Sequence, residues 1–442
     1  MNLSTSLTKY LHGPSDTDAF VGRSISSHTR SEYSTADPLN INELISIPQG
    51  QHGLRKQKKI RSLRHIESVR LHEQDHISYE DKTIQIKGVG NSVLLLEWYM
   101  ELPTAVRERV RVTGLQPLVD GLNRADMDVP LMQALAEKWW DTTHTFIFEQ
   151  LGEMTMTPKD FSAITGIPVY GRPIKIDKHI HRKKDTIRRL LGRPLACVNQ
   201  RRVDINWLYQ SYKNMSTTTE EDIDILSRVF ILALLGATLF ARANDMVHLF
   251  YLPSLDCIAN INNFNWGGAG LAFCYQQMDD LCRQNTSKIG GLWKAWEVWG
   301  REYLPCMRIT PQCISSKVFP CSLLWGNCLP PTMEAKVLLK YYRLKLTQLT
   351  SEQVEWYPWG ANTLHPYYVA QSEEPNTRRI LLVGPDGGEW YLGERVTMQT
   401  SATEINKKSD DINHMTLLQK TNSSSNSKHP RMFLFWFTNE KF

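Results

Sequence analysis

The distribution of tryptophan sets the limits of the folded part of this chain. None of the 13 tryptophans precedes Trp98, twelve lie between Trp98 and Trp390, and the last is Trp436. A tryptophan side chain buries a large apolar area, so a series of them marks packed structure. We therefore expect one folded body over residues 89–399.

The two ends of the chain differ from this body in composition. Residues 1–50 are rich in Ser, Thr and Asn with little periodicity, and residues 400–442 are similar. Such segments cannot bury enough apolar surface to offset the entropy lost on ordering, which predicts a disordered arm and a disordered tail. Between the arm and the body, residues 51–88 are expected to form a basic, polar linker.

Charge and apolar content exclude several classes of protein. The 51 basic and 46 acidic residues leave a net charge of +5, which by itself does not indicate a nucleic-acid-binding protein. The longest apolar run, residues 229–241, is 13 residues long, whereas a helix needs about 20 to span a bilayer. We expect no membrane partner. The N-terminus lacks the apolar region of a secretory signal, so the eight cysteines are expected to be reduced.

Apolar residues at helical spacing dominate the body. They predict helices over residues 94–110 with a break at Pro103, and over residues 128–140, 158–166, 268–283, 290–304 and 333–348. The segment 229–240 is apolar on all sides and is expected to be the buried centre of the domain.

Helix-capping residues support these assignments. Thr157 and Asp160 have the spacing of a capping box, and Gly166 is placed to end the same helix. Thr218 and Glu221 repeat the capping-box spacing before the central apolar helix. Asp128, followed by a proline in the first turn, opens another helix.

Two β-hairpins are expected among the helices. The runs 145–148 and 153–157 are β-prone and flank a short turn, and Asp386-Gly387 separates two β-prone runs within residues 379–396. The predicted fold is therefore mainly α, within the α+β class: a compact helical domain with short β-hairpins and disordered tails.

One segment matches the residue pattern of a catalytic motif. His72, Glu73 and His76 form H-E-x-x-H, which on a helix would hold zinc with the glutamate as general base. Gln74 and Asp75 are polar where a buried zinc helix needs neutral or apolar residues, and the segment lies outside the tryptophan-bearing body. We interpret it as a solvated polar helix and assign no metal ligand and no cofactor.

Two clusters of basic residues are candidates for a nuclear import signal or for contact with nucleic acid. A solvated charged surface is the alternative interpretation for both. The second cluster belongs to a segment, residues 175–193, without interleaved aromatic residues, so base stacking is not indicated. The candidate residues are Arg55, Lys56, Lys58, Lys59, Arg61 and Arg64 in the linker, and Lys183, Lys184, Arg188 and Arg189 in the body.

Two further patterns are interpreted as structural. Cys306, Cys313, Cys321 and Cys328 lack the close pairs typical of zinc sites. The glycine-rich segment 266–270 opens a helix but lacks the lysine of a phosphate-binding loop, which favours close helix packing over anion binding.

Residues 139–174 (WWDTTHTFIFEQLGEMTMTPKDFSAITGIPVYGRPI) resemble the signature of the plant mobile domain family. The resemblance continues in the central apolar helix, in NWGGAGLAFCYQQM and in LWKAWEVWGREYL, and more loosely in FPCSLLW, VEWYPW and WYLGERVTMQ. FPCSLLW departs from the family pattern, with Cys321 where members often carry Arg. Together these motifs cover residues 89–399.

The resemblance implies a plant nuclear protein of the maintenance-of-meristems-like group. Such domains occur in transposable elements and in proteins that silence transposons and maintain meristems, some of them alongside a PP7-type serine/threonine phosphatase. The family has no established catalytic residues. It has carried the label aminotransferase-like, but no lysine here lies in a recognisable Schiff-base setting.

Six residues of the signature are interpreted first as structural. They are Trp139, Gly152, Glu153, Asp160, Gly166 and Pro168. Glu153 has a second interpretation as a buried anchor for a basic partner.

The expected function is that of a non-enzymatic nuclear module in silencing or meristem maintenance. Its expected partners are a PP7-type phosphatase or other plant mobile domain proteins. The alternative is a transposon-derived protein that binds DNA directly through its basic segments. A third and weaker alternative is a zinc hydrolase built on His72, Glu73 and His76.

Overall fold

The computed structural model of the chain describes residues 76–79, 84–90, 92–122, 126–194, 201–308, 319–325, 333–360, 365–396 and 399. These residues all belong to one unit of tertiary contacts, residues 38–442. The predicted arm (1–50), the tail (400–442) and most of the linker (51–88) lie outside the described residues.

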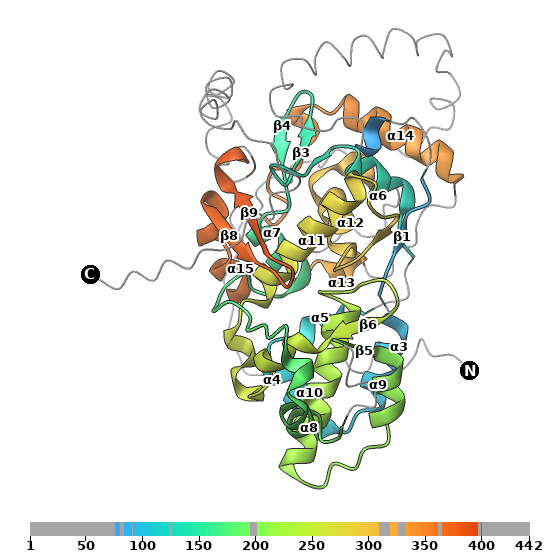
Figure 1. Cartoon of the computed structure of the whole chain (residues 1–442). Helices are drawn as coiled ribbons and strands as arrows, with labels where there is room; N and C mark the ends of the chain where they lie inside the picture. Colours follow the sequence, from blue (N-terminus) through green and yellow to red (C-terminus); the bar gives the residue numbers. More distant parts are fainter. Residues whose placement is uncertain are drawn as a thin grey trace, which may run out of the picture. The chain divides into compact units, whose positions relative to one another are not determined.

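Helices form most of the described structure, as expected for a mainly α fold (Figure 1). The α-helices are α3 (Ser92–Glu101), α4 (Thr104–Val112), α5 (Gln116–Asp120), α6 (Val129–Ala136), α7 (Pro158–Thr165), α8 (Lys184–Leu191), α9 (Ile205–Tyr212), α10 (Glu220–Ala237), α11 (Trp266–Cys282), α12 (Lys294–Tyr303), α13 (Ser322–Trp325), α14 (Ala335–Thr347) and α15 (Tyr367–Gln371). None of these described helices has the length and hydropathy needed to cross a bilayer.

The strands are short and pair in small groups. They are β1 (Lys87–Gly88), β2 (Trp139–Trp140), β3 (Thr145–Phe148), β4 (Gly152–Met154), β5 (Arg202–Asp204), β6 (Met246–His248), β7 (Lys288–Ile289), β8 (Arg379–Val383) and β9 (Gly388–Leu392). Strands β2, β3 and β4 form an antiparallel sheet in sequence order, β5–β6 and β8–β9 are antiparallel pairs, and β1–β7 is parallel. Both predicted hairpins, β3–β4 and β8–β9, are present.

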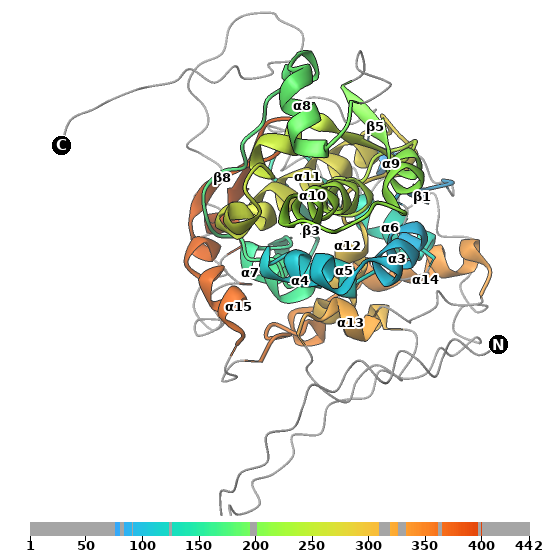
Figure 2. The ribbon, with the colours of Figure 1, turned by 90° about the horizontal axis from the view of Figure 1, so that it is seen from below.

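Helix α10 is the buried centre of the domain, as predicted. Its residues from Ile225 to Ala237 are buried on every side, and Figure 2 shows α3, α4, α8 and α9 around it. The capping box differs from the prediction by one residue: Thr219 is the N-cap and Asp222 its partner, in place of Thr218 and Glu221. Three threonines followed by three acidic residues allow the same spacing in three registers, and the structure adopts the last of them.

A second difference concerns the end of the helix that begins at Asp128. The prediction extends it to Trp140, but α6 ends at Ala136 and the two tryptophans form β2. Trp139 pairs with Phe146 across the sheet, and the Lys138 carbonyl accepts a hydrogen bond from Ile147 N at 2.8 Å. Cross-strand pairing of large side chains stabilises a strand here, against the helical spacing of the sequence.

Helix α7 begins and ends as predicted. Thr157 and Asp160 form a complete capping box, and Gly166 closes the helix at φ 76°, a left-handed conformation that favours glycine. The predicted break at Pro103 separates α3 from α4.

The glycine-rich start of α11 allows a close approach between two segments, as expected. A Cβ on Gly267 would lie 2.3 Å from the Pro168 carbonyl oxygen, in the segment that follows α7. Helix α11 therefore packs directly on the backbone of the signature segment.

The β8–β9 hairpin lies beside α11 (Figure 1). This packing brings the C-terminal part of the described chain next to the sheet of β2, β3 and β4. Trp390, for example, contributes the carbonyl oxygen that contacts His144. Residues far apart in the sequence therefore meet where α11, β9 and the β2–β3 turn come together.

Candidate functional site

Aromatic side chains behind β2 and β3 form the rigid base of the site. The rings of Trp139 and Phe146 are 4.9 Å apart, and Trp296 from α12 packs edge-on against both at 5.2 and 5.4 Å. Trp299, one turn later on α12, stacks on Phe146 at 4.8 Å. These fully buried rings fix the position of the turn that joins β2 to β3.

His144 lies in that turn, with its side chain 10% exposed. Its backbone φ is 53°, an uncommon and strained conformation for a residue other than glycine. Its ring stacks on Tyr275 of α11 at 5.1 Å. Its Nδ1 is 2.8 Å from the Trp390 carbonyl oxygen, and because a carbonyl only accepts, Nδ1 carries the hydrogen.

Two carboxylates face the other ring nitrogen of His144. Nε2 lies 3.3 Å from Asp279 Oδ2 on α11 and 3.4 Å from Glu389 Oε2 on β9. Their side chains are 23% and 22% exposed, so the cluster is close to the surface but largely enclosed.

The outer oxygens of the two carboxylates have their own donors. Trp139 Nε1 donates to Asp279 Oδ1 at 2.7 Å, and Gln276 Nε2 donates to Glu389 Oε1 at 2.6 Å. The remaining oxygens therefore point toward the imidazole. We call His144, Asp279 and Glu389 the His–Asp–Glu cluster.

The cluster strongly favours positive charge at its centre. Burial by itself lowers the pKa of His144, but Asp279, the hydrogen bond to Trp390 and Glu389 together raise it to about 9. The two carboxylates therefore stabilise a proton on the His144 ring.

Asp160, from the signature, is at the centre of a different buried network. Oδ1 accepts hydrogen bonds from Tyr303 Oη at 2.8 Å and Trp359 Nε1 at 2.7 Å, while Oδ2 accepts from Thr157 N at 2.8 Å and Gln399 Nε2 at 3.0 Å. Burial raises the pKa of Asp160. Since all four partners donate, this geometry supports the structural interpretation of Asp160.

Glu153 has an intramolecular partner. Its carboxylate receives two hydrogen bonds from the Arg395 guanidinium and one from Thr145 Oγ1 at 2.9 Å. The basic group that it binds thus belongs to the same chain. Gly152, which pairs with Phe148, has φ 81° at the β3–β4 turn.

The remaining signature residues occupy packing positions. Trp139 is fully buried, a Cβ on Gly166 would lie 2.6 Å from the Pro117 side chain, and Pro168 meets Gly267. Among the six signature residues, Trp139 alone contacts the His–Asp–Glu cluster directly, through Asp279.

The second basic cluster lies on and beside α8. Lys183, Lys184, Arg188 and Arg189 are all exposed, while Ile187, Leu190 and Leu191 on the opposite face of the helix are buried. Lys183 pairs with Asp177 at 2.8 Å and Arg189 with Asp256 at 2.9 Å.

Acidic residues also surround α8. A shallow depression beside Arg188 and Arg189 is lined by Asp185, Glu221 and Asp222. The positive charge is therefore partly compensated locally, which weakens any attraction for phosphate.

The linker cluster of Arg55, Lys56, Lys58, Lys59, Arg61 and Arg64 lies outside the described residues, and so do His72 and Glu73. His76 is described, and it is not solvated as predicted: it is 3% exposed. Its Nε2 is 2.8 Å from the Trp139 carbonyl oxygen and its Nδ1 is 2.8 Å from Ser78 Oγ. Packing against the β2 backbone buries this histidine, and both ring nitrogens contact other residues.

The cysteines predicted as structural are in part described. Cys321 is buried and Cys306 half-buried, neither in a disulfide, while Cys313 and Cys328 lie outside the described residues.

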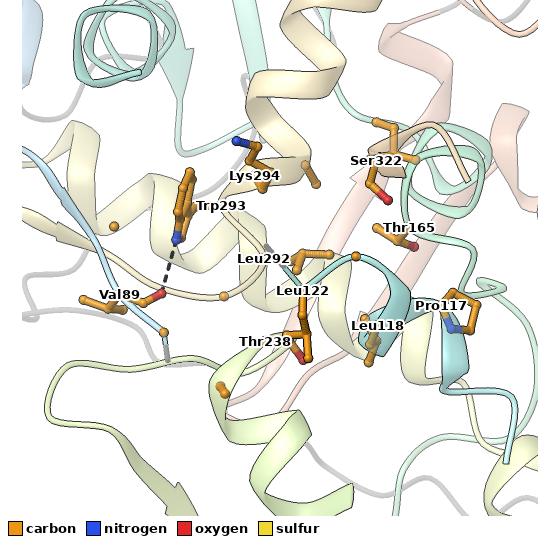
Figure 3. A pocket seen from close by; sticks show the side chains of 17 residues that line it. Val89, Pro117, Leu118, Leu122, Thr165, Thr238, Leu292, Trp293, Lys294 and Ser322 are labelled. Carbon is orange, nitrogen blue, oxygen red and sulfur yellow. Dashed lines mark hydrogen bonds between the residues drawn. The ribbon is translucent and has the colours of Figure 1, made fainter. Parts of the chain in front are cut away.

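A small cavity opens between α5, α12 and the β1 segment (Figure 3). Its volume is about 100 Å³, against about 300–1,000 Å³ for typical small-molecule sites. Lys294 is among its lining residues, with Nζ 3.5 Å from Glu297 Oε2. Trp293 Nε1 closes one side by donating to the Val89 carbonyl at 3.2 Å. The cavity is too small for a typical organic cofactor.

Sequence reasoning did not identify the His–Asp–Glu cluster. His144 belongs to the His-Thr-Phe run that supports the family resemblance, but Asp279 and Glu389 have no spacing that relates them to it. The one sequence feature that could have indicated the cluster is His144 itself, a histidine within the family signature.

Comparison with known proteins identifies relatives. The sequence model of the plant mobile domain matches residues 121–437, a range that begins and ends later than the expected 89–399. The chain is 27% identical over 345 residues to Protein MAINTENANCE OF MERISTEMS from Arabidopsis thaliana, covering 76% of this chain and 70% of that protein. No solved structure matches.

Two other relatives, also from Arabidopsis thaliana, match over smaller shares of their length. The chain is 31% identical over 252 residues to Protein MAIN-LIKE 1, covering 54% of this chain and 48% of that protein. It is 26% identical over 289 residues to a serine/threonine-protein phosphatase 7 long form homolog, covering 62% of this chain but 21% of that protein.

Proposed function

Because the chain belongs to the plant mobile domain family, we propose that it is a non-catalytic nuclear interaction module. In this proposal it acts in transposon or gene silencing and in meristem maintenance, through protein partners. The observation that supports it most is the similarity, over 345 residues, to a protein named for maintenance of meristems.

The proposed partners are a PP7-type serine/threonine phosphatase or other plant mobile domain proteins. A relative named as a phosphatase 7 long form homolog contains a region similar to this chain in 21% of its length. Domains of one polypeptide are held at high effective concentration, whereas a separate chain must bind its partner. We therefore propose that this chain binds a PP7-type phosphatase.

An exposed apolar face on the β8–β9 hairpin supports a protein partner. Leu381 and Trp390 pair directly across the strands, and they are 38% and 47% exposed, with Val383 beside them at 38%. Contiguous exposed apolar residues mark interaction sites, and tryptophan is enriched among the residues that dominate binding. We call these three residues the hairpin face and propose that the phosphatase binds there.

Affinity purification of the tagged full chain from nuclease-treated plant nuclei tests this proposal. We expect the wild-type chain to recover a PP7-type phosphatase. A chain carrying both Leu381→Ser and Trp390→Ser should recover at least about 90% less phosphatase, because truncating a dominant binding residue costs about 2 kcal/mol or more. Val112→Ser is the matched control, because Val112 is also exposed, at 59%, but lies on α4. Equal recovery by all three chains would contradict the role of the hairpin face.

Direct DNA binding is the alternative function. Within the described part of the chain, Lys184 and Arg188 form no ion pair, which leaves two cations on α8 for phosphate. If DNA is the partner, its affinity should fall steeply with salt, because counterions return to the phosphates. Two results together would favour this alternative. The pull-down would recover no partner protein, and the DNA affinity would fall steeply with salt, with a slope that Lys184→Ala and Arg188→Ala reduce.

Nuclear localisation is part of the proposal and has its own test. The linker cluster has the composition of an import signal. A fluorescently tagged chain should concentrate in the nucleus, and replacing Lys58 and Lys59 with alanine should shift it to the cytoplasm. A wild-type chain that stays cytoplasmic would contradict the nuclear assignment.

A further inference from the structure

Three acceptor atoms converge in the His–Asp–Glu cluster. With Nδ1 protonated by its contact to the Trp390 carbonyl, Nε2 of a neutral ring presents a lone pair toward Asp279 and Glu389. This Nε2 and one oxygen from each carboxylate lie within 4.8 Å of one another. Three acceptors in one place repel each other unless a cation lies between them.

The surrounding residues orient all three groups toward this common point. The Trp390 carbonyl holds the imidazole, Trp139 Nε1 holds the outer oxygen of Asp279, and Gln276 Nε2 holds that of Glu389. Metal-binding histidines usually donate their other N–H to a carbonyl or carboxylate, and metal-binding carboxylates are themselves hydrogen-bonded. The same pattern is complete around this cluster.

The distances fit a metal ion better than a shared proton. Nε2 lies 3.3 and 3.4 Å from the two carboxylate oxygens, longer than the roughly 2.7–2.9 Å of a charged N–H···O hydrogen bond. Ligands at about 2.0–2.2 Å from a tetrahedral Zn²⁺ are separated from one another by about 3.3–3.6 Å. Both Nε2–carboxylate separations fall in that second range.

The backbone at His144 adds an independent observation. Its φ of 53° lies in the left-handed region, which is uncommon for a residue other than glycine. Such conformations persist where the surrounding structure requires them and are concentrated at functional sites. Here the strained turn places the imidazole on Tyr275, facing α11 and β9.

We propose that His144 Nε2, Asp279 Oδ2 and Glu389 Oε2 bind one divalent transition-metal ion, with Zn²⁺ as the preferred ion. Imidazole favours Zn²⁺ over Mg²⁺ and Ca²⁺, and for a given site Zn²⁺ binds more tightly than Mn²⁺. The ion joins the β2–β3 turn, α11 and the C-terminal hairpin, so it stabilises the arrangement that presents the hairpin face. The ion goes beyond the proposed function and does not depend on it.

Zinc titration of the full chain tests the proposal. The protein is stripped with a chelator and titrated with Zn²⁺ alone, with calorimetry and thermal unfolding as readouts. The eight cysteines and 13 histidines offer other binding sites for zinc. The informative quantity is therefore the difference in bound zinc between wild type and each variant. We expect wild type to bind one equivalent more than Asp279→Asn or Glu389→Gln, or to bind it at least about tenfold more tightly.

The two amide variants keep the size of each side chain and the outer oxygen that accepts a hydrogen bond, so they are expected to fold. Asp386→Asn is the matched control, since it removes one negative charge from the same hairpin, where Asp386 pairs with Arg242, and leaves the ligands intact. Free Zn²⁺ at roughly 100 times Kd should raise the Tm of wild type and of Asp386→Asn by about 5 °C. The two ligand variants should show no such rise.

Cobalt substitution gives a readout of ligand type. Co²⁺ at this site should give the visible spectrum of a nitrogen and oxygen environment, without a thiolate charge-transfer band, in wild type and not in Asp279→Asn. The proposal is wrong, and the cluster holds a proton instead, if wild type and the two ligand variants bind equal amounts of zinc with equal affinity. It is equally wrong if Zn²⁺ leaves the Tm of wild type unchanged.

Discussion

At the scale of single residues, the same capping-box motif contributes very differently to stability at two positions. Asp160 and Asp222 are each the third residue of a helix and each completes a capping box with a threonine. Asp160 is 1% exposed and accepts hydrogen bonds from Tyr303, Trp359 and Gln399 as well, whereas Asp222 lies at the surface. Burial turns a helix cap into the centre of a network.

Asp160→Asn should therefore be much more destabilising than Asp222→Asn. The amide presents an NH₂ group to partners that are all donors, and a buried polar group left unsatisfied costs about 1–3 kcal/mol. We expect Asp160→Asn to lower the free energy of unfolding by about 3 kcal/mol, and Asp222→Asn to have a far smaller effect. Urea unfolding of both variants measures the difference, and similar losses would show that the network contributes little.

At the scale of secondary-structure elements, the packing of α11 on the signature segment depends on a glycine. Gly267 lies so close to the Pro168 carbonyl that a Cβ would be 2.3 Å from its oxygen. The clashing atoms belong to the backbone, which cannot change rotamer as a side chain can. The N-terminus of α11 is also held by Asn265, whose side chain accepts from Gly268 N at 2.7 Å.

Gly267→Ala should separate these two segments and lower the free energy of unfolding by about 1–3 kcal/mol, the usual cost of overpacking. Gly387→Ala, in the β8–β9 turn, is the control, because a Cβ there meets nothing within 4 Å. Its effect should stay within about 0.5 kcal/mol. Thermal and urea unfolding of the two variants give the comparison, and a stable Gly267→Ala protein would contradict the close approach.

At the scale of the whole molecule, the C-terminal part of the described chain holds the signature in place. Gln399 accepts from Thr155 N at 3.0 Å, donates to the Thr155 carbonyl at 2.7 Å and donates to Asp160. Arg395 binds Glu153, and Trp390 binds His144 through its carbonyl. These contacts span about 240 residues of sequence, so the hairpin and the signature should unfold together.

A double-mutant cycle between Gln399 and Asp160 tests this coupling. Gln399→Ala and Asp160→Asn remove partners within one network, so their combined effect on unfolding should differ from the sum by about 0.5–3 kcal/mol. Gln399→Ala combined with Asp222→Asn should be additive within about 0.5 kcal/mol. Additivity in both pairs would show that the two ends of the domain are energetically independent.

Much of the fold followed from spacing along the sequence. The capping box at Thr157, the turn at Asp386-Gly387 and the apolar run of α10 depend on residues within a few positions of one another, and all three were predicted. The failures have a common cause. Trp139 and Trp140 lie at helical spacing, but their pairing with β3 decided their structure, and packing against β2 buried His76.

The amino-acid sequence by itself determined the helical class of this protein, its family and the start and end of α7, because these depend on local hydrogen bonds and on apolar periodicity. Only the tertiary structure decided what His144, Asp279 and Glu389 form together. They lie on a turn, a helix and a strand, and no rule of spacing relates them. Packing of α11 between the β2–β3 turn and the C-terminal hairpin brings their side chains to one point.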